Sequence, residues 1–492
     1  MQKQNIRQSF VSYHFLFQII MACGFGLLLG IACGLSAGWL AVGLLIAALV
    51  ASITIKRAEV ALLGILLVTS SILFEEQLPL VSAGGISLQV SDFLLLGMLG
   101  LLIVRWLAEP GFKFVHTPLD WPLLLFYGAL LLSSILAMLN SSLDFEAGRR
   151  GVRVITYYLT FFVVTNFVIE RRQLNLLVNG IFLMATITAG VMVAQYILGD
   201  SVKLLPGRVE ELSTEGVGYS GITRILPPGV SIVWVSFITV FCILILENIK
   251  PHGWLEYIQF GLLGMALLFS FLRSYWGASV AVFFLLFFIL RGQDRKKLVN
   301  RGVIIIVSAV VVFLVFYGIM GSQAQMLANA SSERFNTVFR IETYTGKDNS
   351  LNSRKIENEY AFRKLSQTPW LGVGMKANYR PWDSRLDYPG FDGRDFIHNG
   401  HLNVLLRSGV IGYLCFLWLT IVFLVRGFKY WRGISSLRMR GVFLGFTLVC
   451  VALLMAAYTN SFYVTWSWTP VIGIMMGVNE NILRIYGPEE KT

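Results

Sequence analysis

The sequence predicts an all-α, polytopic membrane protein with about fourteen membrane-spanning helices, and three observations support this class. First, 56% of its 492 residues are hydrophobic and only 14% are charged, whereas about 25% of the residues in a soluble domain are charged. Second, the mean hydropathy is +0.68, and apolar stretches of the roughly 20 residues that cross a bilayer recur along the chain. Third, these stretches do not alternate in polarity, as transmembrane β-strands would.

Hydropathy places the spans in order along the chain. They begin near Phe15, Gly38, Ala58, Asp92, Trp121, Val152, Leu174, Gly229, Leu255, Ser274, Gly302, Ser408, Gly441 and Trp466. Residues 1–320 then hold about eleven spans, 321–401 form one long polar loop, and 402–492 hold the last spans. Within the loop, apolar residues at helical spacing in 352–366, followed by Pro369, predict a helix.

The distribution of basic residues predicts the orientation. One set of alternate loops holds clusters of Lys and Arg residues, as in 291–301 and 426–440, whereas the opposite short loops are poorer in them. Loops rich in basic residues stay in the cytoplasm. An even number of spans then places both termini in the cytoplasm and the loop 321–401 outside. This bias also explains the net charge of +12, so no nucleic-acid partner is expected. All five cysteines lie in apolar runs, which predicts no disulfide framework.

Several arginines nevertheless lie on the predicted outer side, among them Arg153. Arg273 stands alone between two apolar stretches, which predicts a tight helical hairpin with Arg273 at the outer interface. Burying an unpaired guanidinium is unfavourable, so a carboxylate or a bound phosphate should meet it. Arg224 precedes Pro227 and Pro228 at the outer end of a span, where an interfacial anchor is the alternative role.

The sequence DFIHNGH at 395–401 places His398, Asn399 and His401 at the mouth of the span that follows the long loop. A neutral imidazole can accept a proton near physiological pH, as a general base must. A histidine with a structural role at the helix end is one alternative. A zinc site that combines both histidines with nearby aspartates such as Asp395 is another, although no HExxH or cysteine pattern accompanies them.

Three stretches of the chain resemble the O-antigen ligase and O-antigen polymerase family of bacterial envelope glycosyltransferases. They match its His-Asn signature, its arginine, helix and Gly-x-Gly stretch, and its arginine hairpin. In this chain these are IHNGHLNVLLRSGVIG at 397–412, Arg354 with AFRKLSQTPWLGVGMKANY at 361–379, and LRSYWGASVA at 272–281, in which Arg273 matches the arginine. Leu272 stands where the family often has serine, and Pro-Pro-Gly follows Arg224 in place of a glycine and asparagine pattern.

The resemblance implies a helical bundle like that of C-type glycosyltransferases, in the bacterial inner membrane, with its active site on the periplasmic face. The donor would be a saccharide on undecaprenyl pyrophosphate, and the acceptor a lipid-linked or glycan-linked hydroxyl. His398 would be the general base, while Arg273 and Arg224 would hold the donor diphosphate without a metal ion or cofactor. Supporting residues would be Asn399, His401, Arg354, Arg153 and Asp395. Ligase and polymerase both fit, and a transporter of a small anion or lipid-linked substrate is the alternative function.

Overall fold

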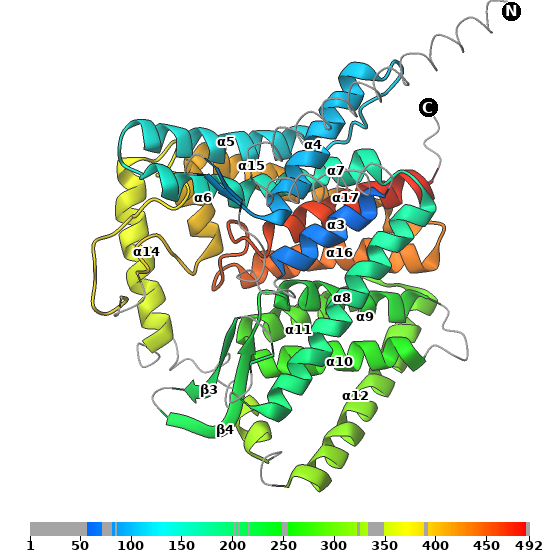
Figure 1. Cartoon of the computed structure of the whole chain (residues 1–492). Helices are drawn as coiled ribbons and strands as arrows, with labels where there is room; N and C mark the ends of the chain where they lie inside the picture. Colours follow the sequence, from blue (N-terminus) through cyan, green and yellow to red (C-terminus); the bar gives the residue numbers. More distant parts are fainter. Residues whose placement is uncertain are drawn as a thin grey trace, which may run out of the picture. The chain divides into compact units, whose positions relative to one another are not determined.

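The helices of the computed structural model follow the predicted spans from Ala58 onward (Figure 1). The model describes residues 57–70, 81–83, 86–199, 203–204, 207–214, 217–247, 254–321, 325–332, 349–387 and 392–488, so the spans predicted near Phe15 and Gly38 lie outside it. The helices are α3 (Ala58–Thr69), α4 (Val90–Ala108), α5 (Asp120–Leu139), α6 (Phe145–Thr156), α7 (Thr160–Phe167), α8 (Arg171–Leu198), α9 (Val230–Leu246), α10 (Trp254–Ser270), α11 (Arg273–Ile289), α12 (Gly292–Met320), α14 (Asn349–Gln367), α15 (Gly400–Tyr430), α16 (Leu437–Ala456) and α17 (Thr469–Tyr486).

Not every helix has the length of a membrane span. Among the described residues, α4, α5, α8, α15 and α16 are long and apolar enough to cross a membrane, whereas α3, α9, α10 and α11 are apolar but shorter. The span predicted near Val152 is a broken helix, because the 3-10 turn Tyr157–Leu159 separates α6 from α7. A mostly helical chain with several candidate membrane spans is therefore confirmed, and the count of about fourteen spans stays a prediction.

Two antiparallel β-hairpins interrupt the all-α architecture that the sequence predicts. β1 (Val81–Ala83) pairs with β2 (Ile86–Leu88), and β3 (Arg208–Thr214) pairs with β4 (Val217–Leu226). The sequence predicts Arg224 at the end of a span, but the structure places it in β4. This strand is rich in β-branched residues, which favour extended backbone. It ends before Pro227, which lacks the N–H that would continue the ladder.

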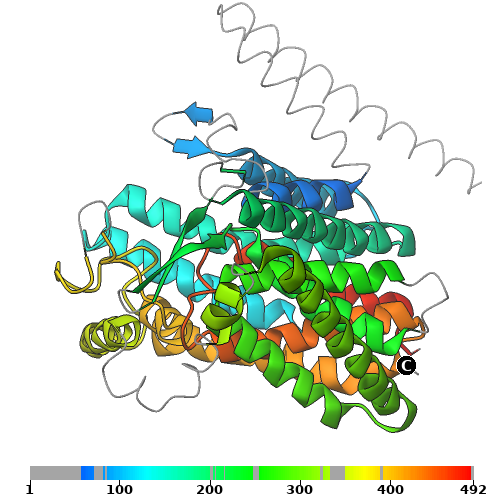
Figure 2. The ribbon, with the colours of Figure 1, turned by 90° about the horizontal axis from the view of Figure 1, so that it is seen from below.

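Arginine side chains cap the C-terminal ends of two helices. Arg301 donates from Nη1 to the carbonyl of Glu247 at the end of α9 (2.8 Å), and Arg484 donates from Nη1 to the carbonyl of Thr165 in α7 (3.0 Å). The last carbonyls of a helix lack partners within it, and a cation near them is favourable. In Figures 1 and 2, α14 and the end of α17 lie at opposite ends of the molecule. Helix α14 is thus remote from the end of α17.

α15 is interrupted at Gly409, where φ is 64° and ψ is −171°. The interruption leaves backbone N–H and C=O groups of α15 without hydrogen-bond partners in the helix. The loop after α14 supplies other backbone partners for them. Val373 N donates to Leu406 O (2.9 Å), and Val410 N donates to Pro369 O (2.8 Å). The Gly-x-Gly stretch of this loop therefore lies directly against the broken helix, so the two backbones approach closely.

We expect Gly409→Ala to destabilise the protein. A Cβ at Gly409 would lie 2.2 Å from the carbonyl oxygen of Trp370, and a positive φ is unfavourable for alanine. The free energy of unfolding should fall by about 1–3 kcal/mol from the backbone conformation alone, measured as thermal or denaturant unfolding in detergent. Gly277→Ala in α11 is the control, because a Cβ there has no neighbour within 4 Å. Equal stability of the two variants would contradict this account.

Candidate functional site

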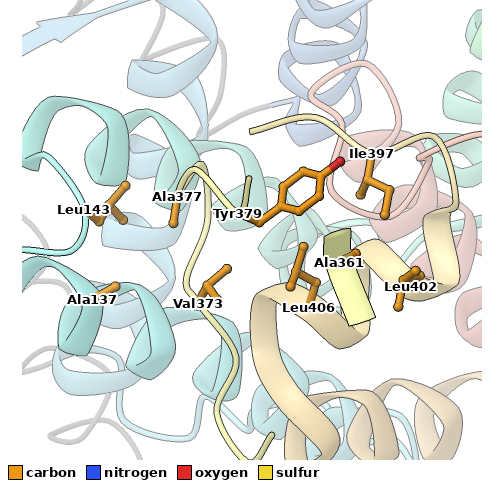
Figure 3. Packing of buried hydrophobic residues seen from close by; sticks show 9 residues of the cluster. All are labelled: Ala137, Leu143, Ala361, Val373, Ala377, Tyr379, Ile397, Leu402 and Leu406. Carbon is orange, nitrogen blue, oxygen red and sulfur yellow. The ribbon is translucent and has the colours of Figure 1, made fainter. Parts of the chain in front are cut away.

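An apolar cluster fixes α14 and the loop that follows it on the ends of α5 and α15 (Figure 3). The cluster consists of Ala137, Leu143, Ala361, Val373, Ala377, Tyr379, Ile397, Leu402 and Leu406. α14 contributes Ala361 to it, and the predicted helix within the loop is confirmed by the bounds of α14. Since Ile397 directly precedes His398 and both Ile397 and Ala361 are fully buried, the backbone that carries His398 is held against α14.

His398 is hydrogen-bonded to the carboxylate of Glu357, which no sequence motif indicates. Both oxygens of Glu357 lie 3.0 Å from His398 Nδ1, and Glu357 Oε2 also accepts the backbone N–H of His398 at 3.0 Å. The side chain of His398 is 40% exposed and that of Glu357 only 7%. A carboxylate accepts from Nδ1–H, which leaves the lone pair on Nε2. Among the described residues, no side chain or carbonyl is hydrogen-bonded to this Nε2.

The neighbours of His398 have structural partners. Asn399 caps α15, because its Oδ1 accepts from Leu402 N at 3.0 Å. His401 Nε2 donates to the carbonyl of Leu454 (2.9 Å), and its Nδ1 lies 3.4 Å from the hydroxyl of Tyr413. Both nitrogens of His401 are therefore engaged within the protein. Within the described ranges, no group of three or more His, Cys, Asp and Glu side chains is arranged to hold a metal ion.

Arg407, for which no sequence motif indicates a role, joins the loop after α14 to α15. It is 2% exposed, and its guanidinium donates to the carbonyls of Gly374 (3.1 Å), Ala377 (2.6 Å) and Asp395. The carboxylate of Asp395 pairs instead with Lys376 Nζ at 2.9 Å. The backbone carbonyl of Asp395 thus helps to fix the loop, and its carboxylate forms an ion pair with Lys376.

A second ion pair stabilises the tip of the same loop. Arg380 and Asp387 are almost fully buried and form two hydrogen bonds of 2.6 and 2.8 Å. The Arg380 guanidinium, helped by the backbone N–H groups of Asp383 and Gly393, lowers the pKa of Asp387 to about 2. A lowered carboxyl pKa stabilises the folded loop above the unfolded value of about 4, and this contribution is lost as the pH falls toward 2.

Arg153 and Arg354 differ in their surroundings. Arg153 donates from Nε to Asp92 Oδ1 (2.8 Å), and its guanidinium lies over the ring of Trp466 at 5.1 Å. Tyr157 donates to the same Asp92 oxygen at 2.7 Å. Arg153 therefore has a carboxylate partner within the protein. Arg354 lies on α14 and is partly buried, one helical turn before the glutamate that contacts His398.

Arg273 and Arg224 lie at the same turn, the one that connects α10 to α11. α10 ends at Ser270 and α11 begins at Arg273, which confirms the predicted tight hairpin, and Phe271 within the turn has a φ of 51°. Arg224 Nε donates to the carbonyl of Ser270 at 3.3 Å, while its Nη1 lies 3.7 Å from Glu210 Oε1. Hairpin β3–β4 thus delivers a second guanidinium to the turn where α11 begins.

The connection between α16 and α17 joins this arginine turn to the histidine segment. The backbone N–H of Gly400 donates to the carbonyl of Ala457 at 2.6 Å, and Asn460 Nδ2 donates to Ser274 Oγ at 2.7 Å. A Cβ at Gly400 would lie 2.5 Å from the Asn460 carbonyl oxygen. The segments that carry His398 and Arg273 therefore contact the same short stretch, although more than 100 positions separate them in the sequence.

Comparison with known proteins adds one finding. Residues 258–417 match the family model described as O-antigen ligase. The matched segment contains the α10–α11 hairpin, α14 and the first part of α15, while hairpin β3–β4 precedes it. A comparison with curated proteins finds no match.

Proposed function

We propose, from the match of residues 258–417 to the O-antigen ligase family model, that this membrane protein is a glycosyltransferase of the ligase or polymerase type. It would transfer a saccharide from an undecaprenyl-pyrophosphate-linked donor to an acceptor hydroxyl. One observation supports the proposal: the segments with His398 and Arg273 each contact the α16–α17 connection. Glycosyl transfer from a diphosphate needs both a base and cationic groups, and these residues supply them.

The proposed reaction exchanges one carbon–oxygen bond for another. The bond between the anomeric carbon and the donor diphosphate breaks, and the diphosphate leaves with the electron pair. The acceptor oxygen forms the new bond to the same carbon, and its proton passes to His398 Nε2. Arg273 and Arg224 compensate the charge that develops on the diphosphate, as preorganised cations do in other transferases. No metal ion or cofactor is required in this scheme.

The proposed setting is the bacterial inner membrane, with both termini in the cytoplasm and the loop that carries α14 in the periplasm. Basic residues at the helix ends opposite α14 support this orientation. In a variant without native cysteines, Ser350→Cys should react with a membrane-impermeant maleimide in cells with a permeabilised outer membrane. Gln293→Cys should react only after the inner membrane is opened. The reverse labelling pattern would place His398 on the cytoplasmic face of the membrane and would contradict the proposal.

A transfer assay tests the activity itself. Purified protein in detergent would be incubated with undecaprenyl-diphosphate-linked oligosaccharide, first alone and then with a lipid A core acceptor. Release of undecaprenyl diphosphate together with a longer lipid-linked glycan would indicate a polymerase, and a glycosylated lipid A core would indicate a ligase. Energy-independent movement of intact donor across proteoliposomes, with no new glycosidic bond, would favour the transporter instead.

A further inference from the structure

We infer that Glu357 is a positioning residue for His398: its carboxylate holds the imidazole in the Nδ1–H form and directs the Nε2 lone pair toward the acceptor. The inference rests on the proposed function, since it assigns a role in that reaction. It extends the site to α14, a helix of the outer loop that lies 41 positions from His398 at the contact. Nothing in the sequence pattern around His398 indicates this partner.

The contact fixes the imidazole at two points. Glu357 Oε2 accepts the backbone N–H of His398, which holds the carboxylate relative to the main chain. Both carboxylate oxygens also lie 3.0 Å from Nδ1, which fixes the rotation of the ring. The ring of Phe396 stands edge-on to the imidazole, with centroids 4.8 Å apart. The imidazole is therefore oriented before any substrate binds.

Both partners are held by the same apolar cluster. Glu357 is 5% exposed, and Ala361, one turn further along α14, is fully buried against Ile397, the residue before His398 (Figure 3). A carboxylate shielded in this way is an effective partner for the imidazolium that forms when the acceptor proton arrives, because the local dielectric constant is low. In this scheme only one proton moves, from the acceptor hydroxyl to His398 Nε2.

Three other carboxylates of the described loop pair with basic side chains. Asp395 pairs with Lys376, and Asp387 pairs with Arg380. Asp383 pairs with Arg385. Each of these pairs joins a carboxylate to a permanently basic side chain and has an evident structural role. The Glu357 carboxylate, in contrast, contacts the side chain that the proposed reaction uses as its base.

The test compares Glu357→Gln with Glu359→Gln, which makes the same charge change on an exposed position of the same helix. Glutamine keeps the size of the side chain but loses the charge and cannot accept both N–H groups equally well. Release of undecaprenyl diphosphate from an undecaprenyl-diphosphate-linked oligosaccharide should show kcat lowered on the order of 10²- to 10⁴-fold in Glu357→Gln, with KM for the donor nearly unchanged. Glu359→Gln should match the wild type.

A double-variant cycle separates positioning from a general structural role. If Glu357 acts through His398, adding Glu357→Gln to His398→Ala should cause no further loss, because residues that act as a unit are not additive. A further loss, or wild-type kcat in Glu357→Gln, would overturn the inference. Wild-type turnover in His398→Ala would instead overturn the proposed base. If Glu357→Gln fails to fold, Glu357→Asp keeps the charge and should show an intermediate kcat, and an unchanged kcat would overturn the inference.

Discussion

His398→Ala should lower the rate of glycan transfer by about 10²- to 10⁴-fold, because loss of a positioned general base removes the acceptor for the hydroxyl proton. The side chain is 40% exposed, so its truncation leaves no buried cavity, and the folded protein should still bind donor. The measurement is kcat at saturating lipid-linked donor and equal membrane abundance. KM for the donor should change little, since the proposed role lies in the transition state.

His401→Ala is the matched control for this result. His401 donates from Nε2 to the carbonyl of Leu454 at 2.9 Å, so its loss removes a structural hydrogen bond worth about 0.5–1.5 kcal/mol. We expect a lower melting temperature and largely retained turnover below that temperature. Near-normal turnover in His398→Ala would remove the base assignment. Equal inactivation of both variants, together with inhibition by chelators, would favour the zinc alternative.

Arg273→Ala should lower transfer by about 10²- to 10³-fold, the usual effect of losing one preorganised group that stabilises developing charge. Arg273 begins α11, and Arg224 donates to the carbonyl of Ser270 in the turn that precedes α11, so two arginines share this turn. Arg273→Lys should show an intermediate rate, because lysine keeps the charge but loses the planar fork that binds two oxygens. Donor affinity is measured separately by binding of undecaprenyl diphosphate.

Arg150→Ala controls for the general loss of positive charge on the predicted outer side. Arg150 is another arginine of the predicted outer side, and its side chain is 64% exposed. Its removal should leave kcat and donor binding near the wild-type values. A change in ionic strength should alter kcat of the Arg150→Ala variant and of the wild type to the same extent. Wild-type transfer by a folded Arg273→Ala protein would exclude Arg273 from the site, whatever the behaviour of Arg224.

The helices were largely predictable because a bilayer imposes long apolar runs, which hydropathy detects directly. The turn at Arg273 was predictable for the same reason, since two apolar runs meet there. Hairpin β3–β4 was missed, because a window of about 20 residues averages over a strand half that length. Arg224 was therefore expected at the end of a span, whereas it lies in β4.

The polar contacts of the site depend on tertiary structure and left no local signal. Glu357 lies in a helix rich in polar residues, where a carboxylate normally faces water. Its only sequence indication is its position four residues before Ala361, on the face that becomes buried. Arg407 lies within an apolar run, and its carbonyl partners come from the preceding loop. Distant partners of this kind cannot be deduced from composition or periodicity alone.

The arginine caps at the ends of α7 and α9 bear on the order in which the protein is assembled. Arg484 of α17 caps the end of α7, with 319 positions between donor and acceptor, and Arg301 of α12 caps the end of α9. During synthesis the earlier helix emerges first, so its last carbonyls must be hydrated at the membrane surface until the later helix is inserted. The carbonyls at the end of α7 therefore gain their arginine partner only after α17 is inserted. We expect membrane proteases to degrade chains that are truncated before α17.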